Sequence, residues 1–574
     1  MAKYTVTVVD TTGIQPYIFG SNRLQENIGA SELVRLATGE WALEAVIEVA
    51  AQHNVKAAKT GELGDFEIGQ ATGGAAEVIY SGGGNTVVIF SGLSLAREFA
   101  RRLTRQALRD APGLSLVVAH DDQFDWDSGA ALSVIVSGLI DKRLAARKAS
   151  RLPSSPLLGL GVTAACESTG LVATRTNEGE FRPAEKYRLV RLKLSDEEQT
   201  RLISREVACK LWARDAATRT LKRLFARELS DWYEFPSDMD KLGRIKGEES
   251  YVAVVHADGN GMGRRVKQIA DDHPNVSDNR KYIREMRKFS DDVEKAASEA
   301  LRRIVKLLTD RITWEHGREH IAESVPMEGA YLPFRPLVFG GDDVTFVCNG
   351  QLGLSLSVEY LKAYEEQTKA RGLKDMCASA GVAIVKMHYP FARAYALSVE
   401  LAGSAKSYVW QKYGERRSAS ALDWHIAMSG LSGSISAIRA REYQGLSRKS
   451  DELASTLLMR PLLLRPEPND QDGRAWCERL EKLTLEFQRK EPWAGSRNKL
   501  KSLREVLREG LYGNTQAVTA FLRNLELNEL PEIVPGLDKY RKTGSDGNRC
   551  GYFDAIELLD HYLHLPFDNK EEAK

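Results

Sequence analysis

The chain has 574 residues, and its 80 Lys and Arg residues balance its 79 Asp and Glu residues to a formal net charge of +1. This length leaves room for three or four domains, and the charge balance excludes a global electrostatic attraction to nucleic acid. No apolar run approaches the roughly 18 residues that a membrane helix needs, and no signal peptide is evident. The six cysteines suggest a reducing compartment. We therefore expect a cytoplasmic protein with no membrane partner.

The N-terminal part of the sequence predicts a compact unit of strands and helices. An apolar strand from Tyr4 to Asp10 precedes a long helix across Ala30 to Ala51. Val78 to Phe90 is typical of a hairpin, turned by the Gly-rich stretch Gly82 to Asn85. A helix with Leu95, Phe99, Leu103 and Leu108 on one face and a strand from Leu114 to Ala119 complete the unit.

The same order of elements recurs later in the chain, which therefore looks internally duplicated. A buried strand from Tyr251 to Ala257 leads into Asp258 and a Gly-rich bend from Gly259 to Gly263, whose backbone N–H groups can face an anion. A long helix, a hairpin turned by Gly340-Gly341-Asp342-Asp343, a helix and a strand follow. This βαββαβ order predicts two ferredoxin-like Palm domains in an α+β fold.

Adjacent carboxylates, Asp342 and Asp343, stand at the tip of the second hairpin. Two unit charges about 4 Å apart repel by roughly 4 kcal/mol at an effective dielectric near 20, so a cation is the usual remedy. Carboxylates suit Mg²⁺ or Mn²⁺, and a metal held there can orient and neutralise nucleotide phosphates. The first strand of the unit should bring Asp258 beside them. We expect Asp258, Asp342 and Asp343 to form a catalytic metal site.

In the first hairpin, Gly84 and Asn85 stand where the second hairpin has Asp342 and Asp343. This hairpin therefore cannot hold a metal as the second one does. It still offers backbone N–H groups and an amide to a nucleotide, or it serves only as a structural turn.

Four motifs in this order resemble the large tandem-Palm subunit of type III CRISPR effector complexes. They are Asp10-Thr-Thr-Gly-Ile-Gln15-Pro-Tyr-Ile-Phe19, Gly82-Gly-Gly-Asn85, His256-Ala-Asp258-Gly-Asn-Gly-Met-Gly263 and Gly340-Gly-Asp-Asp343. The resemblance covers nearly the whole chain and implies that ATP, bound between the Palms, is converted to cyclic oligoadenylate with two divalent metals at the three aspartates. It also implies partners: other effector subunits, guide RNA and target RNA.

The chain departs from many relatives in two ways. Its first Palm strand begins at Tyr4, so we expect no HD nuclease domain, and the His120-Asp121 pair should lie at a strand end. Thr169 stands where a CxxC pair beginning at Cys166 would have its second cysteine, so we expect no zinc.

Lys406 precedes an expected strand from Ala421 to Ile426, and related nucleotidyl cyclases place a lysine in a similar helix-end position against the β- and γ-phosphates. His256 is expected to be a core histidine. A basic run is expected to be a solvated helix face more than an RNA contact, and it consists of Lys142, Arg143, Arg147, Lys148 and Arg151. The residues expected to bind ATP are Gly259, Asn260, Gly261, Met262, Gly340, Gly341, Lys406, Gly82, Gly83, Gly84 and Asn85.

We expect four domains: a first Palm (1–165), a helical insert without a zinc site (166–248), a second Palm (249–429) and a helical C-terminal domain (430–574). The leading hypothesis is an ATP-using nucleotidyltransferase of an RNA-guided complex. Two alternatives stay open at this point. One is a stand-alone nucleotidyl cyclase with another product, and the other is a catalytically idle scaffold, against which the retained aspartates argue.

Overall fold

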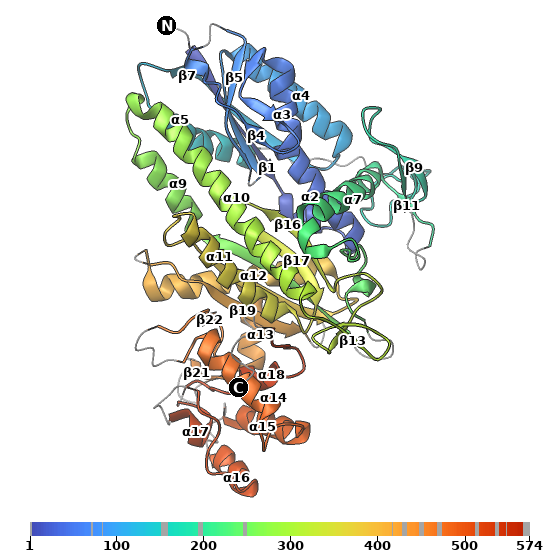
Figure 1. Ribbon diagram of the computed structural model, residues 1–574, viewed down its shortest axis with the longest axis vertical. Coiled ribbons are helices and arrows are strands. Elements are labelled where there is room, and N and C mark those ends of the chain that lie inside the picture. The colour runs from blue at the N-terminus through green and yellow to red at the C-terminus, as the bar shows by residue number, and fades with distance from the viewer. Residues whose placement is uncertain are drawn as a thin grey trace.

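The computed structural model in Figure 1 is an elongated molecule with the N-terminal unit at one end and the C-terminal helices at the other. No helix among the described residues is long and apolar enough to cross a membrane. The structure describes residues 3–70, 73–82, 84–150, 159–192, 199–244, 250–415, 417–427, 433–446, 453–467, 473–510, 516–533, 539–546 and 548–565.

The first Palm is built on a sheet whose strand order is β2-β5-β6-β1-β7. Strands β5, β6, β1 and β7 pair antiparallel, which is the ferredoxin-like order that the sequence predicts. The strands are β1 (Lys3–Thr12), β2 (Gln52–His53), β5 (Ala75–Gly82), β6 (Asn85–Phe90) and β7 (Ser115–Asp125), and β3 (Val55–Ala57) pairs separately with β4 (Glu62–Leu63). The helices are α1 (Ile14–Phe19), α2 (Leu24–Thr38), α3 (Glu40–Val49), α4 (Leu93–Asp110), α5 (Leu132–Gly138) and α6 (Ala145–Ser150).

The second Palm repeats this order as β16-β17-β12-β18, and β19 and β22 extend the sheet. The tandem α+β architecture is therefore confirmed. The strands are β12 (Tyr251–Asn260), β16 (Phe334–Gly340), β17 (Asp343–Asn349), β18 (Cys377–Lys386), β19 (Ala421–Ala427) and β22 (Leu462–Leu463), with β13 (Ile312–Glu315), β14 (Arg318–Ile321) and β15 (Val325–Pro326) in a small separate sheet. The helices are α9 (Met262–Asp271), α10 (Asn279–Thr309), α11 (Gly353–Ala370) and α12 (Phe391–Tyr413).

The segments expected to be helical also contain strands. In the insert, α7 (Arg205–Leu224) and α8 (Ala226–Leu229) follow short strands, which are β8 (Arg175–Thr176), β9 (Gly179–Phe181), β10 (Val190–Leu192) and β11 (Leu202–Ile203). The C-terminal segment contributes β22 to the second Palm sheet and forms the hairpin β20 (Gln444–Leu446) and β21 (Leu453–Thr456). Its helices are α13 (Ile435–Glu442), α14 (Glu481–Arg489), α15 (Arg497–Gly510), α16 (Gln516–Asn524), α17 (Lys539–Thr543) and α18 (Phe553–Glu557).

Three local expectations were wrong. The long helix expected across Ala30 to Ala51 is two helices, α2 and α3, separated at Gly39. The pair His120-Asp121 lies inside β7, where His120 contacts Thr7 and Asp121 pairs with Arg143, and not at a strand end. Leu108 is exposed, because Ala107 takes its place on the buried face of α4.

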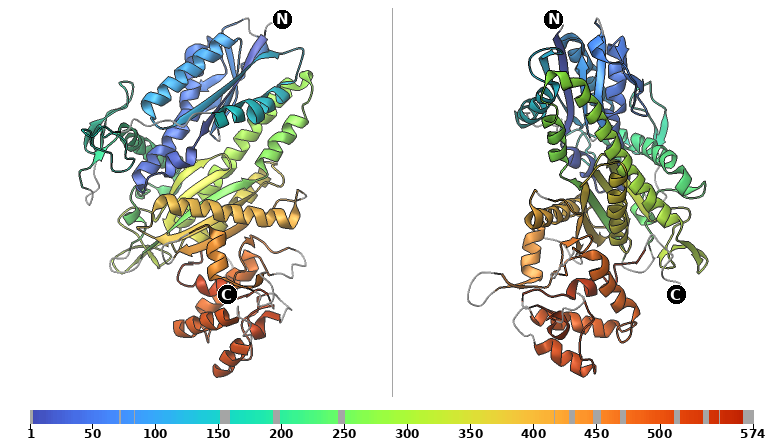
Figure 2. Two further views of the ribbon diagram at one scale, coloured as in Figure 1. Left: turned by 180° about the vertical axis from the view of Figure 1, so that it is seen from behind. Right: turned by 60° about the vertical axis from the view of Figure 1, so that its left-hand side comes forward.

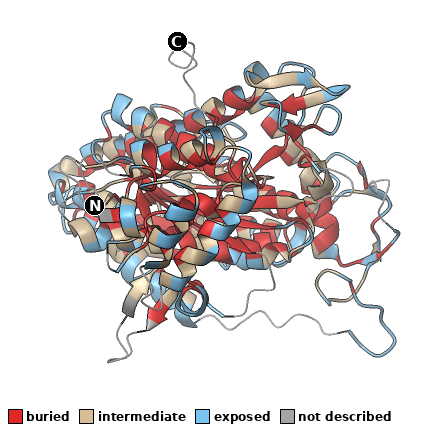
Figure 3. Cartoon of the chain, turned by 90° about the horizontal axis from the view of Figure 1, so that it is seen from below, coloured by how far each residue is buried: buried red, intermediate tan, exposed pale blue. Residues whose placement is uncertain are grey.

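Helix α10 serves two hydrophobic cores. Its first half packs Tyr282, Met286 and Phe289 against the first Palm sheet, in a cluster with Val6, Val8, Ile79, Val87 and Ile89. Its second half, including Ala300 and Ile304, packs in the core of the second Palm. Figure 2 shows this helix crossing from one Palm to the other, and Figure 3 shows the continuous buried interior. A 31-residue helix spans about 46 Å, enough to join both cores.

Polar and aromatic contacts reinforce this junction. Arg280 of α10 forms a 2.6 Å ion pair with Glu77, a buried carboxylate of β5. On the opposite side, Phe19 of α1 stacks on Tyr395 of α12 with ring centroids 3.6 Å apart. Each Palm therefore supplies helices that pack on the other.

Helix α12 lies close to β18 at Gly381. A Cβ atom at this position would come within 2.0 Å of the carbonyl oxygen of Ser398 on α12. We predict that Gly381→Ala will lower the free energy of unfolding by about 1–3 kcal/mol, because the backbones have to separate. Chemical denaturation measures this change.

Gly403, exposed on the same helix, is the matched control, since a Cβ there meets no atom within 4 Å. Gly403→Ala should raise stability by about 0.5–1 kcal/mol through lower chain entropy. Equal stability of the two variants would contradict the close approach.

Candidate active site

Strand pairing brings the aspartates of the second Palm to one edge of the sheet. Ala257 pairs with Val344, so Asp258, one residue on, lies opposite the hairpin tip that carries Asp342 and Asp343. The approach is tight at Gly259, where a Cβ atom would lie 2.7 Å from the Cβ of Asp342. Only glycine therefore fits at this position.

The turn itself also depends on glycine. Gly340 and Gly341 have φ values of +153° and +72°, a region that other residues rarely adopt. This geometry directs the Asp342 carboxylate toward Gly259.

Electrostatics at this edge disfavour ionisation of one carboxyl group. Burial, followed by the nearby charges of Asp258 and Asp343, raises the pKa of Asp342 to about 6. From α11, Tyr360 and Tyr364 present buried hydroxyl groups that have no hydrogen-bond partner among the described residues. Burial and the neighbouring carboxylates raise the pKa of both tyrosines, so their hydroxyls stay protonated. The sequence analysis missed these two residues.

Lys406 reaches the same corner from α12. Its Nζ atom lies 2.5 Å from Oδ2 of Asp258 and donates to the carbonyl oxygen of Gly259 at 3.0 Å. The adjacent helix α9 begins after Gly261, which has a φ of +79°, and no side chain caps its N-terminus. A lysine and uncapped helical N–H groups together suit an anion such as phosphate.

His256 is a core histidine, 5% exposed, as expected. Its Nδ1 atom lies 3.2 Å from Oγ1 of Thr345 and also 3.2 Å from Oδ1 of Asp343, a contact that the sequence analysis did not anticipate. Oδ1 of Asp343 is nonetheless buried without a well-aligned hydrogen bond. It is therefore available to a cation.

The side chain of Asn260 makes structural hydrogen bonds that the sequence analysis did not predict. Its Nδ2 atom donates to Oγ of Ser379 and to the carbonyl oxygen of Ala419, both at 3.0 Å. These bonds fasten the bend after β12 to β18 and to the loop after α12. The Nδ2 atom thus supports the bend, whereas Oδ1 is buried without a hydrogen-bond partner among the described residues, so binding of ATP by Asn260 stays a prediction.

The three carboxylates at this edge suit a hard divalent cation, although their side chains are not already arranged around a metal position. Among the residues that the structure describes, no group of three or more His, Cys, Asp or Glu side chains is arranged to hold a metal ion. Asp258 is engaged by Lys406, while Asp342 and Asp343 repel each other and Oδ1 of Asp343 is buried with only the 3.2 Å contact to His256. Three oxygen donors with excess negative charge match Mg²⁺ or Mn²⁺.

The first Palm retains half of this arrangement. Asp10 pairs with Asn85 across β1 and β6, and Nζ of Lys148 lies 2.5 Å from Oδ2 of Asp10, matching Lys406 and Asp258. Gly84 has a φ of +87°, and Gly82 lies against Ser290 of α10. Gly83 lies outside the described residues. Lys148 was not among the expected nucleotide-binding residues, although it follows the fourth Palm strand as Lys406 does.

The other members of the basic run are mostly engaged with β7. Arg143 donates to the carbonyl oxygen of His120, and Arg147 donates to that of Val118. Lys142 is exposed, and Arg151 lies outside the described residues.

The raised pKa of Asp342 leads to a test of its surroundings. A carboxyl group with a raised pKa in the folded state binds its proton more tightly there, so folding stability falls as pH rises from about 4 to about 6. We predict that Asp342→Asn will stabilise the metal-free protein at pH 7 by on the order of 1–2 kcal/mol, and that the gain will vanish near pH 4. Denaturation at several pH values measures it.

Asp231→Asn, at an exposed carboxylate, is the control and should show no such growth of stability with pH. A gain for Asp342→Asn that is independent of pH would contradict the repulsion among the aspartates.

A family model and several solved structures resemble this chain. Residues 251–412 match the family model of the Cas10/Cmr2 second palm domain, whereas no curated protein matches the chain. Among solved structures, the Csm1-Csm4 cassette in complex with AMPPNP is 12% identical with a TM-score of 0.50, covering 98% of this chain and 68% of that one.

Two further structures of the cassette give similar values. The complex with cA4 is 12% identical with a TM-score of 0.51, over 97% of this chain and 69% of that one. The complex with one ATP is 13% identical with a TM-score of 0.51, over 98% and 70%. At these identities the likeness establishes the fold. The chain therefore carries a second palm domain of the Cas10/Cmr2 type, set within a tandem-palm fold that it shares with Csm1.

Proposed function

We propose that this protein is a metal-dependent nucleotidyltransferase that converts ATP to cyclic oligoadenylate within a type III CRISPR effector complex. The observation that carries the proposal is the clustering of Asp258, Asp342 and Asp343 at one sheet edge, with Lys406 beside them. In the reaction, the 3′-oxygen of one ATP bonds to the α-phosphorus of the next, and pyrophosphate leaves.

The comparisons support the choice of substrate and partners. Structures with the same fold are described as Csm1-Csm4 cassettes in complex with AMPPNP, ATP and cA4. By analogy, we assign ATP as substrate, a cyclic adenylate as product, and a neighbouring effector subunit as partner. Guide and target RNA belong to the same proposal.

Each residue of the second Palm has a part in this chemistry. Asp258, Asp342 and Asp343 would hold the divalent ions, which would neutralise the triphosphate and polarise the attacking oxygen. Lys406 would bind phosphate oxygens, exchanging its contact with Asp258 for the nucleotide. The uncapped N-terminus of α9, after Gly261, would orient the phosphates.

The first Palm would seat the second ATP without a carboxylate pair. Lys148 offers a cation, as Lys406 does, and the hairpin residues Gly82, Gly84 and Asn85 offer backbone groups and an amide. The buried Oδ1 atom of Asn85 has no hydrogen-bond partner in the described part of the chain, which suits a donor on a nucleotide. Two substrates could then meet between the Palms.

The first test removes the two hairpin carboxylates. We predict that Asp342→Ala with Asp343→Ala will abolish product formation while the fold and complex assembly persist, because the turn loses repelling charges and no core packing. Mass spectrometry should follow the products from mixed NTPs with Mg²⁺ or Mn²⁺, for the chain alone and for the complex with cognate RNA.

The matched control replaces Asp121, a carboxylate of β7 remote from the second hairpin, with Ala. Turnover at the wild-type rate in the double variant would rule out the site. Full activity of the isolated chain, indifferent to RNA, would favour a stand-alone cyclase.

The second test concerns the first Palm. We predict that Lys148→Met will raise the KM for ATP by about tenfold with a smaller effect on kcat, since a charge contact to a phosphate contributes on the order of 1–2 kcal/mol. Steady-state kinetics of the assembled complex measures both constants.

Lys142→Met, at an exposed lysine on the preceding turn, is the control and should leave the KM unchanged. Unaltered kinetics in Lys148→Met would mean that the pairing of Lys148 with Asp10 is only structural.

A further inference from the structure

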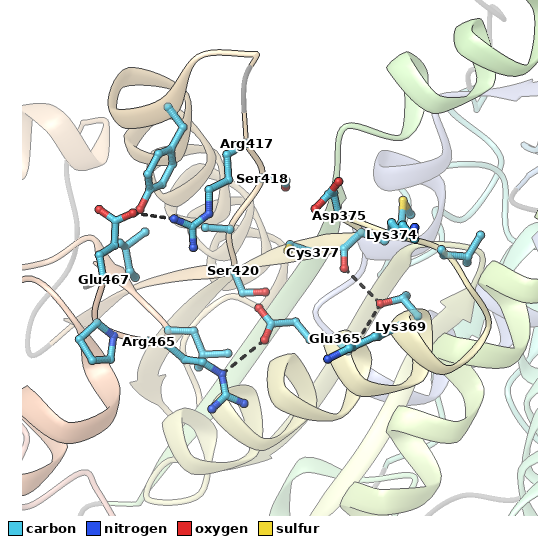
Figure 4. A pocket seen from close by; sticks show the side chains of 18 of the residues that line it. Glu365, Lys369, Lys374, Asp375, Cys377, Arg417, Ser418, Ser420, Arg465 and Glu467 are labelled. Carbon is cyan, nitrogen blue, oxygen red and sulfur yellow. Dashed lines mark hydrogen bonds and ion pairs between the residues drawn. The ribbon is translucent and has the colours of Figure 1, made fainter. Parts of the chain in front are cut away.

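A cleft of about 820 Å³ opens at the same edge of the second Palm as the aspartates, on the side of β18 away from β12. It lies between the end of α11, the start of β18, the loop after α12 and the chain that follows β22, as Figure 4 shows. None of its lining residues belongs to the aspartate and lysine cluster described above. Its volume is in the range typical of small-molecule sites.

One wall of the cleft is apolar. Leu373, Leu463 and Leu464 are buried side chains that line it, and the ring of Tyr413 stands at the rim. The guanidinium carbon of Arg417 lies 5.3 Å from the centre of that ring. A flat heterocycle could lie against this wall with its faces covered.

Charged side chains also line the cleft. Arg417 forms a 2.8 Å ion pair with Glu467, and Arg465 approaches Glu365 at 3.6 Å. Lys369 and Lys374, both labelled in Figure 4, are exposed residues that line the cleft, and they make no ion pair within the described part of the chain. Four cations and three carboxylates, Glu365, Asp375 and Glu467, therefore line the cleft, and Lys369 and Lys374 are the two cations without an ion pair among the described residues.

We propose that this cleft is a second nucleotide site, distinct from the catalytic corner. The leucines and Tyr413 would cover the base, Glu365 would accept hydrogen bonds from ribose hydroxyls, and Lys369 and Lys374 would bind phosphates. This pairing of an apolar wall with a carboxylate and cations matches the three parts of a nucleotide. The inference does not depend on catalysis by Asp342.

Two connections link the cleft to the catalytic corner. Asn260, at the end of the catalytic strand, donates to the carbonyl oxygen of Ala419, which lines the cleft. On α11, Tyr364 lies near Asp342, whereas the next residue, Glu365, lines the cleft. A nucleotide in the cleft would therefore contact the elements that position the aspartates.

Cys377 allows a direct test. It lines the cleft and is the one cysteine of the six that is not buried. Alkylation of the full chain by iodoacetamide, followed by peptide mass spectrometry, reports on access to this thiol. The assay contains EDTA, so that divalent metals do not contribute. ATP at ten times its dissociation constant should slow the alkylation of Cys377 about tenfold, because only the free protein reacts.

The charge reversals Lys369→Glu and Lys374→Glu together should return the rate to within about twofold of that without ATP. Both side chains are exposed, so the core is untouched, and Lys501→Glu on α15 is a matched reversal that should keep the protection. Asp342→Ala should also keep it, which separates this proposal from the catalytic one. Replacing ATP by AMP or by a linear triadenylate distinguishes a mononucleotide from an oligonucleotide occupant.

Two results would overturn the proposal. One is an alkylation rate that none of the three nucleotides changes. The other is protection that survives in the Lys369→Glu and Lys374→Glu variant, since the nucleotide would then bind elsewhere.

Discussion

Asp258, Asp342 and Asp343 are carried to one edge of the second sheet by backbone pairing, and their like charges oppose one another there. In water such repulsion would cost little, but burial of Asp342 strengthens it. Lys406 contacts Asp258 and offsets part of this negative charge, and the tyrosine hydroxyls of α11 stay neutral and add no further negative charge. The glycine at 259 is needed because the carboxylate of Asp342 occupies the space of a side chain.

The first Palm has the same arrangement of strands but lacks the repulsion among carboxylates. Asp10 keeps its lysine, but the hairpin offers Asn85, an amide, in place of a carboxylate. Loss of the hairpin charges removes a destabilising interaction and leaves the sheet, its hairpin and its helices intact. The two Palms thus share the packing scheme and differ in the charge at a single turn.

Much of this arrangement could be predicted from the sequence because it depends on local patterns. Apolar strands bounded by glycines fix the sheets, and the order of elements places Asp258 opposite the hairpin tip. The features that the sequence pattern does not predict depend on tertiary contacts. The bonds of Asn260 to Ser379 and Ala419 join residues far apart in the chain, and Lys148 looks like any solvated lysine until α6 folds back onto Asp10.

The predicted helix boundaries failed for a related reason. Periodicity alone continues through Gly39, where the chain turns between α2 and α3, and it favoured Leu108 over the small Ala107 that the packed face of α4 accepts. Hydrophobicity is a guide to burial, but the space available in the core decides which residue is buried.

The division of α10 between two cores also has a consequence for synthesis of the chain. The first Palm sheet is complete once Asp125 has been translated, yet one of its faces is covered by Tyr282, Met286 and Phe289. These residues are translated roughly 160 residues later, which takes on the order of ten to thirty seconds at about 5–20 residues per second. Until then, the part of that face that α10 covers lacks its packing partner. The packing of this sheet face is therefore complete only when α10 of the second Palm has been made.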